Sequence, residues 1–80
     1  MSEGETIIDG HTVDWMENED DPGRIGVWVD SEPIGSFWMT SKGTWMAEHW
    51  DPGSGGFASE EATADDAIKA LYEHWKSRQP

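Results

Sequence analysis

The sequence contains no cysteine, so neither disulfide bonds nor thiolate chemistry can contribute to its fold or function. Its three histidines, His11, His49 and His74, are widely separated, which argues against a structural zinc site. No run approaches the roughly 20 apolar residues of a membrane span. The N-terminus, MSEGETIIDG, lacks the basic and apolar regions of a signal peptide. We therefore expect a soluble, cytoplasmic protein without metal or other cofactor.

Basic residues are scarce. Five Lys and Arg stand against 17 Asp and Glu, which gives a formal net charge of −12 in 80 residues. The segment 1–21 holds eight acidic residues and no Lys or Arg. Such a field repels nucleic acid and anionic membranes and attracts basic partners. Acidic residues that served only solubility, or adaptation to a salty cytoplasm, should be spread over the whole surface. Their concentration in the first quarter of the chain therefore favours a binding role.

Short β-rich segments separated by turn residues predict strands. The segment 6–15 reads as two strands around an Asp9-Gly10 type I′ turn. Further strands are predicted at 24–30, 34–40 and 44–50, with Ser31-Glu32-Pro33 and an Asp21-Pro22-Gly23 turn interrupting them and a glycine-rich loop after residue 50. We expect a single domain over 1–80, with residues 1–5 flexible.

The segment 63–77 is predicted to be an amphipathic helix. Thr63 is its expected N-cap, although a start near Ser59 is an alternative. Its apolar residues share one helical face: Ala64, Ala67, Ile68, Leu71, Tyr72 and Trp75. A single apolar stripe can cover only one face of a sheet. The predicted fold is therefore α+β, a small antiparallel meander of 3–5 strands with one C-terminal helix packed on one face.

The frame Trp-Met-x4-Asp-Pro-Gly-x2-Gly occurs twice, at 15–26 and at 45–56. Two copies are too few for a solenoid, which needs about three or more. We interpret the frame as a strand end followed by a tight turn, used twice. In the first copy the variable positions are mostly acidic.

Strand alternation separates two faces of the predicted sheet. The face expected under the helix carries Ile25, Val27, Val29, Phe37, Met39 and Trp45. The open face is expected to carry Trp28, Ile34, Ser36, Trp38, Met46 and Trp50. A bulge would reverse part of this assignment. The N-terminal hairpin or a second copy of the chain could cover the aromatic face. If it is uncovered, it marks an interaction site, but the negative charge does not suit stacking of nucleobases.

Catalytic and metal-binding motifs are not found. The acidic run 17–21 does not match a calcium-binding EF-hand loop, because Pro22 and Trp28 fall where Gly and Glu are required. The segment 52–56 is glycine-rich but lacks the Lys-Ser/Thr of a phosphate-binding loop. No motif frames a nucleophile, and no carboxylate pair stands out as acid and base. We therefore expect no enzymatic activity.

Two groups of residues are candidates for binding a partner. The acidic group is Asp14, Glu17, Glu19, Asp20 and Asp21, and the aromatic group is Trp28, Trp38 and Trp50. In an extended chain, Glu17, Glu19 and Asp21 would project on one side about 6.6 Å apart. This spacing is comparable to that of phosphates along a nucleic-acid strand.

These features predict a small inhibitor or decoy that occupies the basic, nucleic-acid-binding surface of a partner protein. It would bind neither nucleic acid nor membrane itself. Small phage-encoded anti-CRISPR and anti-restriction proteins act in this way as a class, and the chain shares only size and charge with them. The alternative is a structural or adaptor module whose tryptophan face mediates dimerisation or protein docking. A third is an ordinary domain whose charge serves solubility. Monomer and homodimer both remain open.

Overall fold

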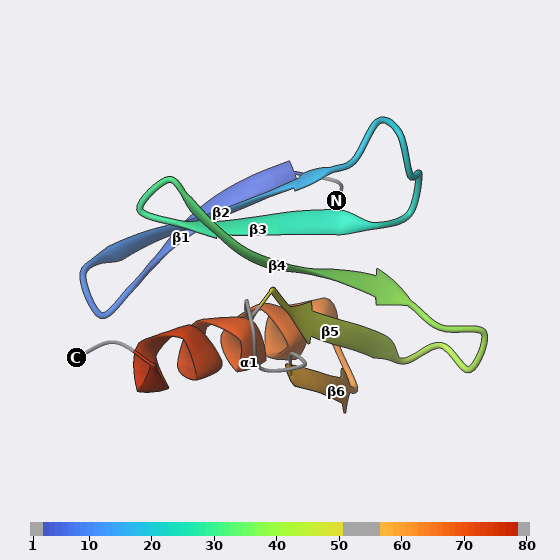
Figure 1. Cartoon of the computed structure of the whole chain (residues 1–80). Helices are drawn as coiled ribbons and strands as arrows, with labels where there is room; N and C mark the ends of the chain where they lie inside the picture. The colour runs from blue at the N-terminus through green and yellow to red at the C-terminus, as the bar shows by residue number, and fades with distance from the viewer. Residues whose placement is uncertain (1–2, 51–56, 79–80) are drawn as a thin grey trace.

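The structure is a computed structural model that describes residues 3–50 and 57–78. Within these ranges the elements in chain order are β1 (Glu3–Ile8), β2 (His11–Glu17), β3 (Ile25–Val29), β4 (Glu32–Met39), β5 (Trp45–His49), β6 (Phe57–Glu61) and α1 (Ala64–Ser77). The strands form one antiparallel sheet in the order β1-β2-β3-β4-β5-β6, and α1 packs on it (Figure 1). The predicted α+β meander with one C-terminal helix is confirmed. The predicted count of 3–5 strands is wrong, since the sheet has six.

Two-residue turns of positive φ join two of the hairpins. Asp9 and Gly10 have φ of 52° and 84° and connect β1 to β2, as expected for a type I′ turn. Asp30 and Ser31 have φ of 49° and 71° and connect β3 to β4. The break between these strands is therefore shorter than the predicted 31–33, because β4 already begins at Glu32. Likewise β1 begins at the third residue of the chain, inside the segment 1–5 expected to be flexible.

A register shift in β4 corrects one assignment of faces. Val27 pairs with Gly35, but Trp28 pairs with Pro33, so Ile34 is an extra residue in β4. This bulge turns Ile34 into the core, where it is 1% exposed, instead of onto the open face. It also explains how β4 tolerates a proline, because the ladder is already interrupted there.

The last two elements differ in how well they were predicted. Helix α1 begins after Thr63, whose Oγ1 accepts a hydrogen bond from the Asp66 amide at 3.1 Å, so the predicted cap is confirmed. Strand β6 was not predicted. Its sequence, FASEE, has no clear alternation, and it is held as a strand by pairing with β5. The glycine-rich segment and the second Asp-Pro-Gly lie outside the described residues.

The core lies between the sheet and α1. All six apolar residues of the helix stripe are buried, and they meet a set from the sheet: Val13, Ile25, Val27, Val29, Ile34, Phe37 and Ala47. Trp45 packs against this core, with its ring centroid 5.6 Å from that of Phe37. Met39, expected under the helix, is 58% exposed. Met39 pairs with Trp45 at the end of β4, beyond the core cluster. It lies on the predicted face of the sheet, but its predicted burial under the helix is wrong.

The first hairpin curls toward the helix. Helix α1 lies against β4, β5 and β6, and the β1–β2 turn reaches the C-terminal half of α1 (Figure 1). There the Asp9 carboxylate accepts hydrogen bonds from the Tyr72 hydroxyl at 3.1 Å and from Lys76 Nζ at 3.0 Å. The rings of His11 and Trp75 meet edge to face, with centroids 5.2 Å apart. The turn and the helix therefore hold the two ends of the domain together.

Across residues 3–50 and 57–78, no helix combines the length and the apolar character that crossing a membrane requires.

Candidate functional site

The face of the sheet opposite α1 is open in the described part of the chain. Cross-strand pairs place Asp14 beside Trp28 and Trp38 beside Met46 on this face. The first hairpin continues the sheet as its edge, so it extends this face and does not cover it. Trp50, just after β5, is 45% exposed, and Met16 is 55% exposed. Residues 3–50 and 57–78 therefore leave the predicted aromatic face uncovered.

A hollow of about 310 Å³ is the main feature of this face. Its apolar lining comes from Met16, Trp28 and Trp50, and two of the predicted acidic residues, Glu17 and Glu19, line it as well. The remaining lining residues are Asn18, Arg24, Gly26 and Ser36. Hydrophobic rings and carboxylates thus meet in one concave site, which we call the acidic–aromatic hollow.

The loop 18–24 positions the carboxylates of the hollow. Its ends are joined by a hydrogen bond from the Asn18 amide to the Arg24 carbonyl at 2.9 Å. The Arg24 amide donates to the Asp21 carbonyl at 3.1 Å, closing the predicted Asp-Pro-Gly turn with Gly23 at φ 93°. One carboxylate oxygen of Glu17 accepts the Gly23 amide at 3.0 Å. This bond anchors Glu17 and leaves its second oxygen for other partners.

The extended arrangement expected for Glu17, Glu19 and Asp21 is wrong, because these residues enter a closed loop. The hydrogen bonds within the loop satisfy backbone groups that an extended strand would leave unpaired. A row of carboxylates at phosphate spacing is therefore absent from this segment, and what replaces it is a carboxylate pair beside two indole rings.

Trp38 is separated from the hollow by Arg24. The guanidinium carbon of Arg24 lies 4.3 Å from the centroid of the Trp38 ring. The same side chain forms ion pairs with Asp21 at 3.3 Å and with Glu48 at 3.5 Å. One guanidinium thus binds one indole ring and two carboxylates on this face. Trp38 is half-buried beneath it and is less available to a partner than Trp28 and Trp50.

The two predicted groups of binding residues therefore meet only in part. Glu17, Glu19, Trp28 and Trp50 line the hollow. Asp14 lines a smaller depression on the other side of Trp28, and Asp20 and Asp21 lie on the loop outside the hollow. Sequence reasoning missed Met16 and Gly26 as lining residues. The repeated Trp-Met frame was a signal for Met16, since its partner in the frame, Met46, lies on the same face.

The carboxylates with shifted pKa values lie outside the hollow. The pKa of Asp9 is lowered, first by its hydrogen bond from Lys76 and then by the one from Tyr72. The pKa of Asp30 is lowered by its contact with His11 Nδ1 at 2.6 Å and by the Thr12 amide. The pKa of Glu60 is lowered by the hydroxyl of Thr44 and by the charge of Lys42. These groups fasten turns and strand ends to the fold.

The hollow has the chemistry of a binding site. Its acidic and aromatic groups can desolvate and neutralise a cation, whereas no nucleophile with an adjacent base lines it. Among the residues that the structure describes, no group of three or more His, Asp or Glu side chains is placed to hold a metal ion. Comparison with protein families, with curated proteins and with solved structures finds no match for this chain.

Proposed function

We propose that this protein binds a basic surface of a partner protein through the acidic–aromatic hollow. By occupying that surface, it acts as an inhibitor or decoy at a site that otherwise binds nucleic acid. The observation that carries the proposal is the meeting of Glu17 and Glu19 with the rings of Trp28 and Trp50 in one concavity. The presence of both kinds of residue in one concavity supports a binding role over a charge that serves only solubility.

The hollow suits a long basic side chain. The aliphatic part of a Lys or Arg side chain can lie against Trp28, Trp50 and Met16, while its charged end reaches the carboxylates. Arg24 on Trp38 shows the same combination within this chain, one cation on an indole ring and between two carboxylates. Such stacking contributes about 0.5–2 kcal/mol, depending on how far the pair is desolvated.

The two kinds of residue should contribute in different ways. Aromatic residues that fill a pocket commonly dominate the affinity of an interface. Long-range attraction from the net charge of −12 mainly speeds association with a basic partner and weakens as salt is added. Trp50→Ala should therefore mainly raise the dissociation rate, and removal of charge should mainly lower the association rate.

The experiment uses a partner captured by the tagged protein and then purified for quantitative binding. In a competition assay, unlabelled double-stranded DNA should displace the protein from that partner. The double variant Glu19→Gln/Asp20→Asn removes two exposed charges that make no side-chain contact needed by the loop. It should slow association at low salt, and the difference should shrink near physiological ionic strength, where the Debye length is about 8 Å.

A matched control separates a local site from overall charge. Asp66→Asn/Glu73→Gln removes the same number of charges from exposed positions of α1, on the opposite side of the sheet. Equal loss of binding in both double variants would mean that only the total charge matters, and the site would be disproved. Partners that DNA cannot displace would disprove the decoy role.

A second candidate function is docking through the apolar part of the same face, including self-association. The exposure of Met16 and Trp50 favours it. Self-association would bring two chains of charge −12 together with Glu17 and Glu19 at the contact. Sedimentation at low and high salt tests this alternative, since such a dimer should form only when salt screens the repulsion.

A further inference from the structure

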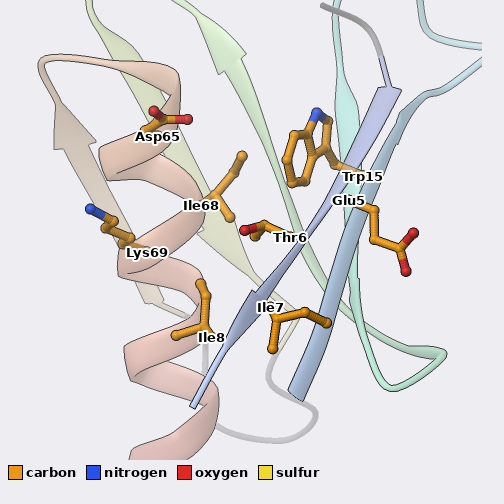
Figure 2. Close-up of a pocket in the computed structure, with 8 residues that line it drawn as sticks. All are labelled: Glu5, Thr6, Ile7, Ile8, Trp15, Asp65, Ile68 and Lys69. Carbon is orange, nitrogen blue, oxygen red and sulfur yellow. The ribbon is translucent and has the colours of Figure 1, made fainter. Parts of the chain in front are cut away.

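Strand β1 is an edge strand of the sheet, and a groove lies between it and the N-terminal half of α1 (Figure 2). The groove has a volume of about 410 Å³. At its far end the β1–β2 turn is tied to the helix through Asp9, Tyr72 and Lys76. The groove is thus closed at the turn and lies beside residues 5–8 of β1.

The register shows which backbone groups of β1 have no partner strand among the residues that the structure describes. The Asp30 amide donates to the Thr12 carbonyl at 2.8 Å, so the backbone of Thr12 faces β3. In an antiparallel ladder, backbone groups of successive residues point to alternate sides. The backbone N–H and C=O groups of Val13 in β2 therefore point to β1, where Val13 pairs with Thr6. By the same alternation, the N–H and C=O groups of Glu5 and Ile7 point away from β2, to the free edge.

The side chains around the groove are divided by the plane of β1. Thr6, Ile8 and Trp15 point into the space between β1 and α1, where they face Ile68 (Figure 2). Glu5 and Ile7 lie on the other side of the strand, and Ile7 is 62% exposed.

The rim of the groove on α1 carries one charge of each sign, from Asp65 and Lys69. Gly4 allows the Trp15 ring to lie against the backbone of β1, because a Cβ at Gly4 would stand 2.5 Å from Cζ2 of that ring.

We propose that β1 accepts an extended segment of a partner protein as an added strand, independently of the acidic–aromatic hollow. The unpaired groups of Glu5 and Ile7 supply the backbone hydrogen bonds of such β-strand addition. One set of alternating side chains on the segment, of apolar character, enters the groove beside Trp15 and Ile68. The other set is basic and lies beside Glu5 and Glu3 on the outer side.

Charge favours a basic segment over a second copy of this chain. Antiparallel pairing of two β1 strands with their free edges together brings the Glu3 and Glu5 carboxylates of two chains of net charge −12 into one interface. The register centred on residue 5 sets Glu5 directly opposite Glu5. Like charges directly opposite in a sheet are destabilising. The acidic side chains therefore discourage self-pairing of an exposed edge, as charged edge strands commonly do, and leave it open to a basic strand.

The probe is a capped peptide of alternating Lys and Val, and its control is a peptide of the same composition with all Lys grouped before all Val. Binding of the alternating peptide should slow amide hydrogen exchange at Glu5 and Ile7 and shift their amide resonances. N-methylation of one peptide amide that faces β1 should weaken binding by about fivefold, the usual effect of losing one backbone hydrogen bond. Methylation of the next amide, which faces outward, should have little effect.

A variant pair tests the same bond from the protein side. Ile7→Pro removes the outward N–H and is tolerated at an edge position, whereas Ile7→Ala keeps it. The proline variant, which has no amide at position 7, should lose affinity for the peptide and protection of the Glu5 amide. The alanine variant should lose less of both. If the proline variant does not fold, the methylated peptides decide the question alone.

Three results would overturn the proposal. These are equal binding of both peptides, resonance shifts centred on Trp28 and Glu17, or a dimer in sedimentation that protects the β1 amides without peptide. Near physiological ionic strength, where long-range attraction is screened, the variants Trp50→Ala and Glu19→Gln/Asp20→Asn should bind the alternating peptide as the parent does. That result separates this edge site from the proposed inhibitor function, so either can fail alone.

Discussion

The indole ring of Trp28 lies over the backbone of Gly26, two residues earlier on β3. A Cβ added at Gly26 would stand 2.9 Å from Cη2 of the Trp28 ring. The missing side chain thus allows the ring to lie down on the sheet and form one wall of the acidic–aromatic hollow.

Gly26→Ala should push the Trp28 ring out of this position. An off-rotamer side chain costs about 0.5–1.5 kcal/mol, so stability should fall modestly while binding of a basic partner falls strongly. Fluorine NMR of fluorotryptophan-labelled protein would show a shifted Trp28 signal. Gly4→Ala is the matched control, because it meets Trp15 in the same way on the helix side of the sheet. It should lower stability without affecting the hollow.

Leu71→Ala and Trp75→Ala should each destabilise the domain strongly. Leu71 is 0% exposed and Trp75 is 8% exposed, and both lie in the core between α1 and the sheet. Truncations of this kind cost about 2–5 kcal/mol for Leu and about 3–5 kcal/mol for Trp. Against a total of roughly 5 kcal/mol for a small domain, either change could unfold it. Chemical denaturation measures the loss, with exposed Glu73→Ala as control, and unchanged midpoints would contradict the packing of α1.

The contact between Asp9 and Lys76 should make stability depend on acid. The pKa of Asp9 lies below its ordinary value of 3.8 because its carboxylate accepts hydrogen bonds from Lys76 and Tyr72. The native state therefore binds this proton less readily than the unfolded chain. The stabilisation is present above pH 3.8 and is lost as the pH falls through the lowered pKa.

Asp9→Asn should accordingly be less stable than the parent at pH 7, and the two proteins should converge in acid. Urea denaturation between pH 2 and 7 gives both free energies of unfolding. Glu32→Gln, at an exposed position, is the control and should follow the parent. A constant difference between Asp9→Asn and the parent at every pH would contradict the role assigned to the Asp9 charge.

Arg24→Lys should uncover Trp38. A lysine ammonium cannot lie flat on the ring while it pairs with both Asp21 and Glu48, as the guanidinium does. Because the Arg24 side chain is 35% exposed, the loss of stability should be small, under about 1 kcal/mol. Acrylamide or paramagnetic broadening of the Trp38 fluorine signal should increase, while the signal of buried Trp75 should not change. Unaltered protection of Trp38 would mean that other groups shield it.

The fold was predictable where local rules and tertiary structure agree. The helical spacing of Leu71 and Trp75, the Thr63 cap and the Asp9-Gly10 turn each follow from short-range geometry. Ile34 was assigned to the wrong face, because alternation alone gives the open face and the bulge that reverses it depends on the pairing between strands. Strand β6 was missed because its pairing with β5, more than its own sequence, makes it a strand.

The candidate site was predictable as two separate groups and not as one place. Alternation assigned Trp28 to the open face, and charge counting singled out Glu17 and Glu19. The loop that brings them together depends on bonds such as that from the Gly23 amide to Glu17. Arg24 was not assigned to the face at all, since its stacking on Trp38 joins residues 14 positions apart.

The strand order also determines how the chain can fold. Every strand pairs with its neighbours in sequence, so each hairpin closes over a short loop and can form quickly. The contact from Asp9 to Lys76 joins residues 67 positions apart and therefore carries a large loop-closure entropy. We expect the sheet to grow hairpin by hairpin and its first turn to reach the helix last. The step that clamps the two ends of the domain is then also the first to reopen in the folded protein.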